Sequence, residues 1–350
     1  MDNKKRILIL RFGAFGDVTM TIPVIASFLK AYPDKEIVFV SRDFAAGLVE
    51  PFDQIKFFLF EPSSKHRGIK GLWRLFCDLR THFGSFDCVL DLHNVLRTKI
   101  LTLLFRIKGI PVYKINKGRS EKKALTRKSN KVFKPLKSTF ERYQDVFLKA
   151  GMHFSINGFN GSHVFIRDGI ALPHSGFNSP RPKIGVAPFA GHPWKAWPEK
   201  YVKELIVQLA NKGYSVFLFG GKGKEQEKLE EWSQLAGNVY CLAGVLSLQE
   251  ELTAMSLLDV MVSMDSANMH LARLVNTKVV SLWGATHPYA GFYGYEMPES
   301  WAVQIDLDCR PCSVFGNKSC HRGDFACMNG ITISMVLNKI DSIIQRMEKP

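Results

Sequence analysis

The feature that most constrains this chain is a junction, present in both halves, at which an apolar strand gives way to a helix beside an acidic residue. In the first half, the apolar run Arg6–Leu10 is followed by a glycine-containing turn, Asp17 and a helical pattern. In the second half, the run Val260–Met264 is followed by Asp265 and another helical pattern. Open α/β sheets bind ligands at the carboxyl ends of their strands, where helix N-termini attract anions. The chain is therefore predicted to form two α/β domains that face a central cleft.

Strands and helices alternate along both halves in the rhythm of doubly wound, Rossmann-like parallel sheets. The helical pattern after Asp17 runs from Val18 to Lys30, whereas the stretch 114–137 has little apolar periodicity and is predicted to be a loop or lid. The segment Pro173–Pro182, rich in Pro, Ser and Gly, is the best linker candidate. The predicted strands include Arg6–Leu10, Glu36–Val40, Ile55–Phe60, Cys88–Leu92, Lys183–Ala187, Ser215–Phe219, Val239–Leu242 and Val260–Met264.

The two halves differ in charge. Residues 1–180 hold 30 Lys and Arg against 15 Asp and Glu, whereas residues 181–350 hold 17 of each. The net charge of +15 therefore belongs to the first half, and residues 97–149 alone hold 16 basic residues against three acidic ones. Such a one-sided field predicts an anionic partner, either a polyanion or a membrane surface. A solvated face without a partner is the alternative.

The composition also limits the cellular compartment in which the protein is expected to work. No apolar run approaches the ~18 residues that span a bilayer, and Arg11 interrupts the run Ile7–Leu10, so no signal-peptide core forms. Seven cysteines, an odd number in a long chain without an export signal, argue against a disulfide framework. We therefore expect a cytoplasmic protein.

Three motifs follow one another along the chain: Phe12–Asp17 with Pro23, Ala187–Pro198 with Lys195, and Asp265–Ala267 with His270–Ala272. In this order they resemble the heptosyltransferase family, glycosyltransferase family 9, of lipopolysaccharide core assembly. The resemblance spans nearly the whole chain, and a cysteine-rich tail near Cys309 is also seen in some family members.

The resemblance implies the two-domain GT-B glycosyltransferase fold. On this basis, residues 1–175 are expected to form an acceptor-binding Rossmann-like domain and residues 176–330 a nucleotide-sugar-binding one. Residues 331–350 are expected to form a helix that packs back toward the first domain.

Asp17 is the catalytic candidate. Glycosyl transfer to a hydroxyl needs a base within hydrogen-bond reach of the attacking oxygen, and the resemblance implies that the matching Asp is the general base of an inverting transfer. Gly13 and Gly16 permit a tight turn that lets the acceptor approach the backbone. The alternative is an Asp that merely favours a helix dipole.

The donor candidates lie in the second half. A Lys at a glycine-containing turn can neutralise a pyrophosphate leaving group, and the N–H groups of a helix N-terminus can hold its phosphates. The family usually has Gly where this chain has Ala267. Glu225, with Glu227 as the alternative, is expected to accept from a ribose hydroxyl, although a first-turn Glu that stabilises its helix explains it equally well. The donor-binding candidates are Lys195, Glu225, Asp265, Ser266, Ala267, Asn268 and His270.

The acceptor candidates follow the predicted strand Cys88–Leu92. His93, Asn94 and Arg97 lie at its carboxyl end and could contact a phosphorylated acceptor, together with Gly13 and Gly16. An Asn cap and an outward Arg are the alternative.

A cluster of four thiols lies near the C-terminus. Cys309 and Cys312 have the spacing of a zinc knuckle, whereas Cys320 and Cys327 are more widely spaced. The segment has little apolar core of its own. A structural zinc ion or paired cysteines are therefore as well supported by the sequence as four reduced thiols.

These features predict an inverting, metal-independent glycosyltransferase that moves a heptose or related sugar from an ADP-sugar to a lipopolysaccharide core or lipid A-type acceptor. No cofactor is expected for catalysis. The expected partners are a nucleotide-diphosphate sugar such as ADP-heptose, a phosphorylated glycolipid and the anionic inner face of the inner membrane, but no nucleic acid. The protein would be cytoplasmic and peripheral, and its membrane contact would include Lys122, Lys123, Arg127 and Lys128.

Two other functions remain open from the sequence. One is a nucleotide-sugar epimerase or hydrolase of the same fold. The other is a basic nucleic-acid-binding protein, although the chain lacks a recognisable binding module.

Overall fold

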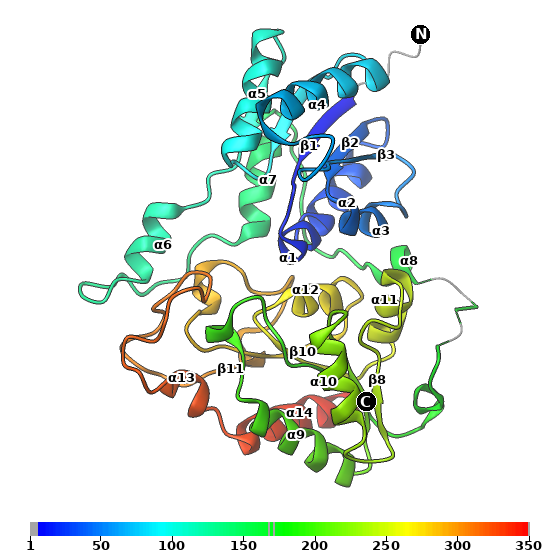
Figure 1. Ribbon diagram of the computed structural model, residues 1–350, viewed down its shortest axis with the longest axis vertical. Helices are drawn as coiled ribbons and strands as arrows, with labels where there is room; N and C mark the ends of the chain where they lie inside the picture. Colours follow the sequence, from blue (N-terminus) through cyan, green and yellow to red (C-terminus); the bar gives the residue numbers. More distant parts are fainter. Residues whose placement is uncertain (1–5, 167–168, 171, 349–350) are drawn as a thin grey trace. The chain divides into compact units, whose positions relative to one another are not determined.

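The computed structural model describes residues 6–166, 169–170 and 172–348, which form two compact α/β units (Figure 1). The first unit comprises residues 1–117 and 139–159, and the second comprises residues 118–138 and 160–350. The predicted α/β class with two Rossmann-like sheets is confirmed. None of the helices in these ranges is long and apolar enough to cross a membrane.

The first unit is built on a five-stranded parallel sheet with the order β3-β2-β1-β4-β5. β1 pairs with both β2 and β4, so Leu8 lies opposite Val38 and Val89. The strand order reverses between β1 and β4, which makes the carboxyl ends of these strands the topological switch point where such sheets bind ligands. The strands are β1 (Arg6–Leu10), β2 (Glu36–Ser41), β3 (Ile55–Leu59), β4 (Cys88–Asp91) and β5 (Val112–Lys114).

Helices cover both faces of this sheet, which explains why the central strands β1, β2 and β4 are buried along almost their whole length. On one face, Leu75 of α4 and Phe105 of α5 share a core with Leu8. On the other, Phe28 of α2 packs against Phe147 of α7 with ring centroids 4.9 Å apart. The helices are α1 (Phe15–Thr19), α2 (Ile22–Ala31), α3 (Ala46–Val49), α4 (Gly68–Phe83), α5 (Leu96–Ile107) and α7 (Thr139–Lys149).

The second unit is built on a six-stranded parallel sheet with the order β11-β10-β9-β6-β7-β8. Read from β8, its strands follow the chain order third, second, first, fourth, fifth and sixth, which is the dinucleotide-binding arrangement. The switch point lies between β6 and β9. The strands are β6 (Lys183–Ala187), β7 (Ser215–Leu218), β8 (Val239–Cys241), β9 (Val260–Met264), β10 (Lys278–Leu282) and β11 (Ala302–Val303).

The core of this unit lies between the sheet and three helices, α9, α10 and α14. The helices α11 and α12 pack on each other, and α12 contacts β9 and β10. The helices of the unit are α6 (Arg119–Leu125), α8 (Ser162–Phe165), α9 (Glu199–Asn211), α10 (Lys224–Ser233), α11 (Leu248–Ser256), α12 (Ala267–Leu274), α13 (Ala326–Asn329) and α14 (Ile333–Glu348).

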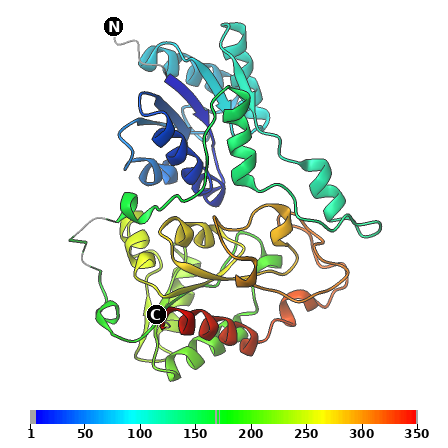
Figure 2. The same cartoon turned by 180° about the vertical axis from the view of Figure 1, so that it is seen from behind.

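The C-terminal helix corrects one expectation. It was predicted to pack back toward the first domain, but α14 buries Val336, Ile340 and Ile343 in the core of the second unit. It lies beside α9 in both views (Figures 1 and 2). The reason is its apolar stripe, which fills the face of the sheet that α9 and α10 leave uncovered.

The unit boundaries also differ from the predicted division after residue 175. The division falls after residue 159, and residues 118–138 join the second unit. The predicted loop or lid contains the helix α6. Two hydrogen bonds tie it to the second unit: the N–H of Leu136 donates to the carbonyl of Tyr289 at 2.9 Å, and the Lys131 Nζ donates to the carbonyl of Arg310 at 2.7 Å.

Candidate functional site

In the first unit, Asp17 is held at the carboxyl end of β1 by a buried arginine. Arg11 follows the last residue of β1, and its Nη2 lies 2.5 Å from Asp17 Oδ2. Its Nη1 donates to the carbonyl oxygen of Leu92 at 3.2 Å. Arg11 therefore ties the turn that carries Asp17 to the end of the neighbouring strand β4, across the switch point of the sheet.

A tyrosine of α7 fixes the backbone of the same residue. The hydroxyl of Tyr143 donates to the carbonyl oxygen of Asp17 at 3.2 Å, and the Arg11 guanidinium lies 5.9 Å from the centroid of its ring. Burial raises the pKa of Tyr143 well above its ordinary value, so the hydroxyl remains a donor. The Asp17 side chain is 32% exposed, which leaves it accessible to a substrate hydroxyl.

The two predicted glycines have different roles in this turn. Gly13 has φ +149°, a backbone conformation that L side chains rarely adopt. Gly16 lies inside α1, where its carbonyl accepts from the N–H of Met20 at 3.0 Å. Only Gly13 therefore needs the conformational freedom of glycine.

His93 and Asn94 lie directly beyond β4, and a buried carboxylate shapes their turn. One oxygen of Asp91, Oδ1, accepts from the N–H of His93 at 3.0 Å and from that of Asn94 at 2.7 Å. Asn94 adopts φ +47° and donates from its side chain to the carbonyl of Ile115. The ring of His93 accepts from the N–H of Phe12 through Nδ1 at 3.4 Å, which brings it to the turn that leads to Asp17.

The surroundings of His93 are positively charged. Burial, together with the charges of Arg11, Lys117 and Arg97, lowers the pKa of His93 to about 3. The imidazole is therefore neutral at physiological pH. A cationic neighbourhood next to Asp17 suits an acceptor that carries a phosphate or carboxylate.

In the second unit, Lys195 and Asp265 meet at the switch point between β6 and β9. Lys195 ends the short 3-10 helix Pro193–Lys195 after β6, and Asp265 follows β9. The Lys195 Nζ lies 2.9 Å from Asp265 Oδ2, and both side chains are largely buried. The carboxylate keeps the ammonium group in place beside the N-terminus of α12.

The start of α12 carries the remaining donor candidates. Ser266 is its N-cap but does not cap it with its side chain, because its hydroxyl lies 3.2 Å from that of Ser263. Ala267 and Asn268 form the first turn and are half-buried, and His270 is buried. The N–H groups of this turn therefore have no side-chain cap, as an anion site at a helix N-terminus requires.

Glu225 lies apart from this group, in the first turn of α10 after β7. Its Oε2 accepts from the N–H of Gly221 at 2.7 Å. The side chain thus closes its own turn in the structure, while Glu227 is bonded through its N–H to the carbonyl of Gly223.

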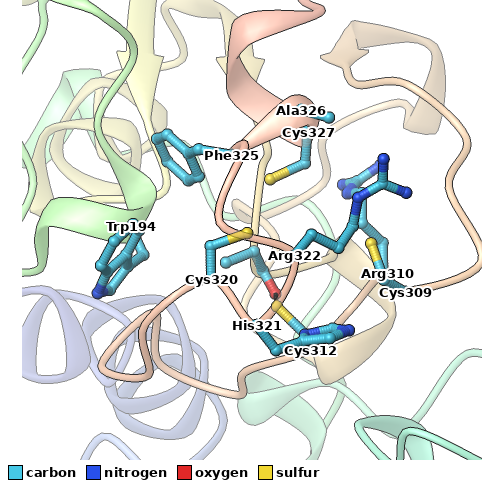
Figure 3. Close-up of a pocket in the computed structure, with 11 residues that line it drawn as sticks. Trp194, Cys309, Arg310, Cys312, Cys320, His321, Arg322, Phe325, Ala326 and Cys327 are labelled. Atoms are coloured by element: carbon cyan, nitrogen blue, oxygen red, sulfur yellow. Dashed lines mark hydrogen bonds between the residues drawn. The ribbon is translucent and has the colours of Figure 1, made fainter.

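The four C-terminal cysteines converge on one pocket, of about 10 Å³, in the second unit. Figure 3 shows their side chains gathered around it, with Trp194 and Phe325 along one side. All seven cysteines are unpaired. Among the described residues, no three His, Cys, Asp or Glu side chains are arranged to hold a metal ion. The pocket is lined by Cys309, Cys312, Cys320, Cys327, Trp194, Ala285, Arg310, His321, Arg322, Phe325 and Ala326.

The cysteine-rich segment also supports the Lys195 turn. A Cβ on Gly316 would lie 2.3 Å from Lys195 Cγ, so the lysine stem passes directly over this glycine. The rings of Trp194 and Phe325 meet edge to face at 5.3 Å. Arg310 anchors the segment, because its buried guanidinium donates to the carbonyls of Gly284 at 2.6 Å and Thr286 at 3.1 Å.

Sequence reasoning missed four residues that organise these sites: Arg11, Asp91, Tyr143 and Arg310. Two of them had a usable signal, since Arg11 and Asp91 are charged residues at the carboxyl ends of apolar strands. Tyr143 and Arg310 had none, because their partners lie far away in the sequence.

The sequence model of glycosyltransferase family 9 (heptosyltransferase) matches residues 72–316 of this chain. The chain belongs to this glycosyltransferase family. The family 9 match includes Lys195 and Asp265 but begins after Asp17. Among curated proteins, lipopolysaccharide heptosyltransferase 1 of Pseudomonas aeruginosa is 23% identical over 323 residues, which cover 88% of this chain and 86% of that protein.

Solved structures of several glycosyltransferases share the fold. The family 9 glycosyltransferase from Veillonella parvula has a TM-score of 0.73 at 18% identity and covers 99% of both chains. An Escherichia coli heptosyltransferase solved with ADP has a TM-score of 0.67 at 17% identity, over 97% of this chain and 99% of that chain. An iron-containing dodecameric glycosyltransferase from enterotoxigenic Escherichia coli has a TM-score of 0.58 at 14% identity, over 99% of this chain and 78% of that chain.

Proposed function

We propose that this protein transfers a heptose from ADP-heptose to a lipopolysaccharide core acceptor, with inversion and without a catalytic metal. The observation that carries the proposal is Asp17, held by Arg11 and partly exposed at the switch point of the first sheet in a family 9 chain. The heptosyltransferase names of its relatives support the sugar and the acceptor class, and the ADP in one related structure supports the nucleotide.

In this scheme Asp17 acts as the general base. Its carboxylate takes the proton of the acceptor hydroxyl while the hydroxyl oxygen attacks the anomeric carbon. The bond between that carbon and the ADP oxygen breaks, and ADP leaves with both bonding electrons. A single displacement of this kind inverts the anomeric centre.

Lys195 and the start of α12 would bind the diphosphate. The Lys195 ammonium group and the N–H groups of Ser266 to Met269 at the start of α12 offer positive charge where the leaving group gains negative charge. These protein groups can supply the charge stabilisation that a divalent cation supplies in other transferases. Asp265 would orient Lys195, and Glu225 would accept from a ribose hydroxyl.

The acceptor is assigned to the first unit. Gly13 and Gly16 would let it approach the turn before Asp17, while His93, Asn94 and Arg97 would contact its polar and phosphate groups. The cationic neighbourhood of His93 supports this role. The enzyme would act at the cytoplasmic face of the inner membrane, where such acceptors are anchored.

The test is turnover of ADP-heptose with and without a lipopolysaccharide core acceptor. Asp17→Asn should lower kcat by ~10²-fold or more, because the proton acceptor is lost, and should leave ADP affinity nearly unchanged, because the proposed donor residues are not altered. Activity of the native enzyme should survive EDTA. Near-normal turnover by the variant would overturn the role of Asp17, and sugar-nucleotide turnover without acceptor would instead indicate an epimerase or hydrolase.

We further propose a structural metal ion at Cys309, Cys312, Cys320 and Cys327. Four thiols around a pocket with room for about one ion fit such a group in donor type and size, although the sulfurs would have to draw together to bind it. The buried Arg310 and the nearby Lys131 would offset the charge of four thiolates. Purified protein should carry about one equivalent of metal, and metal-free protein with four titratable thiols would contradict this site.

A further inference from the structure

Two neighbouring helices of the first unit, α4 and α5, expose large apolar side chains. Ile69 and Trp73 of α4 are 74% and 55% exposed, and Leu96, Leu103 and Ile107 of α5 are 74%, 56% and 70% exposed. These five residues are called the apolar face below. Exposed apolar groups that gather in this way mark interaction surfaces, whereas singly scattered ones do not.

The apolar face is not needed for the fold of the unit. The opposite side of α5 already buries Leu101 and Phe105 in the core. Leu96, Leu103 and Ile107 lie seven and four residues apart, so they follow one another along a single stripe of the helix. α5 is therefore apolar on two sides, and only one of them packs against the protein.

α4 and α5 are neighbours that share one core. They lie side by side in the first unit (Figures 1 and 2). The ring of Trp73 lies 5.7 Å from that of Phe76, which in turn lies 4.9 Å from Phe105 of α5. One aromatic ring thus separates the exposed tryptophan from the second helix.

Basic side chains surround the apolar face. α5 contains no acidic residue, and the acidic residue of α4, Asp78, is paired with Lys65 at 2.6 Å. A Trp with Ile and Leu among Arg and Lys is the composition of surfaces that lie in the headgroup region of a bilayer. The exposed basic residues of this surface are Lys70, Arg74, Arg97, Lys99, Arg106 and Lys108.

We propose that the apolar face docks the protein on an anionic lipid bilayer. Trp73, Leu103 and Ile107 would enter the headgroup region, and the surrounding Lys and Arg side chains would pair with lipid phosphates. α5 starts immediately beyond His93 and Asn94, so the face leads away from the proposed acceptor residues. The inference deepens the proposed function by naming the surface that meets the membrane, and it does not depend on the identity of the sugar.

The structure removes one residue from the membrane contact expected from the sequence. Lys122 is buried, with its Nζ 3.9 Å from the centroid of the Phe292 ring. It cannot meet a bilayer in this arrangement. Lys123, Arg127 and Lys128 of the same segment are exposed, so their predicted membrane contact stays a prediction beside the contact proposed for α4 and α5.

The test is sedimentation of the full chain with vesicles of phosphatidylethanolamine and phosphatidylglycerol, compared with phosphatidylcholine vesicles. Trp73→Ser, Leu103→Ser and Ile107→Ser combined should weaken binding to the anionic vesicles by roughly tenfold or more. Val245→Ser with Leu257→Ser removes two equally exposed apolar side chains from the second unit and should leave binding unchanged. Binding should also fall steeply with salt.

Two readouts keep this test decisive. The melting temperature of the triple variant should match that of the native protein, since all three side chains are exposed. The variant Lys99→Gln with Arg106→Gln tests the same surface without changing its apolar groups, and it should also weaken binding to the anionic vesicles. Unchanged vesicle binding by both variants would overturn the proposal, as would a dimer that the triple variant abolishes while vesicle binding persists. A chain that docks through this face yet transfers no heptose would refute the proposed function alone.

Discussion

Asp17 is held from three directions. Arg11 binds its carboxylate, Tyr143 binds its carbonyl, and α1 begins around it. A carboxylate that must meet a substrate oxygen at hydrogen-bond distance gains most from such constraint, because small displacements are costly in catalysis. The same contacts make Arg11 a positioning residue, since it acts through Asp17 rather than on the substrate.

We predict that Arg11→Met lowers kcat by ~10-fold or more while ADP affinity stays nearly unchanged. The variant keeps much of the side-chain volume but removes the partner of Asp17. Arg6→Met is the matched control, because Arg6 pairs with Glu36 at 2.5 Å at the opposite end of β1. Steady-state kinetics and ADP titration check the prediction, which fails if the two variants lose kcat equally.

For single residues, the sequence predicted which side chains belong to the candidate site better than it predicted which groups those side chains contact. Lys195 and Asp265 were both selected, because each lies at a strand end in a motif that resembles the family. Their contact at 2.9 Å could not be derived, since seventy residues separate them. Asp91 was not selected, because its role depends on hydrogen bonds that only the structure shows: its carboxylate accepts from the N–H groups of His93 and Asn94.

Among the elements, strands were easier to predict than breaks in helices. The apolar runs of buried parallel strands gave their positions within one or two residues. The single helix expected from Val18 to Lys30 is instead two helices, α1 and α2, with Pro23 in the first turn of the second. Proline lacks an N–H and suits that first turn, so this break had a signal in the sequence. The helix α6 had little signal, because much of its support comes from distant residues of the second unit.

The cysteine-rich segment offers a test of how one element supports another. Gly316 has φ +70° and touches the stem of Lys195, whereas Gly323 has φ +80° and has no heavy atom within 4 Å of an added Cβ. Alanine at either position should cost about 1–2 kcal/mol of stability through its left-handed backbone.

Only Gly316→Ala should also move Lys195 away from Asp265. We predict that this variant weakens ADP binding by roughly fivefold or more relative to Gly323→Ala. Isothermal titration calorimetry with ADP, together with melting curves of both variants, makes the comparison. Equal ADP affinity in the two variants would show that the segment does not position the lysine.

At the scale of the whole molecule, two sheets with related strand orders each carry charged residues at their own switch point. The rhythm of strands and helices was enough to predict this duplication. The packing of the last helix could not be predicted in the same way. An amphipathic helix such as α14 can cover either sheet, and the shape of the two cores determines which sheet it covers.

The proposed acceptor residues lie in the first unit, and the proposed donor residues lie in the second. If acceptor and donor contacts are made by different units, Arg97→Gln should raise the KM for the acceptor and spare ADP affinity. Lys195→Ala should weaken ADP binding by ~10-fold or more and spare the acceptor KM, since a charge-assisted contact to phosphate is lost. Because the two residues share no partner, their effects on binding should add to within ~0.5 kcal/mol in the double variant. Acceptor KM and ADP affinity measured for all four proteins provide the test, and a coupling well above that limit would show that one residue contacts the ligand assigned to the other.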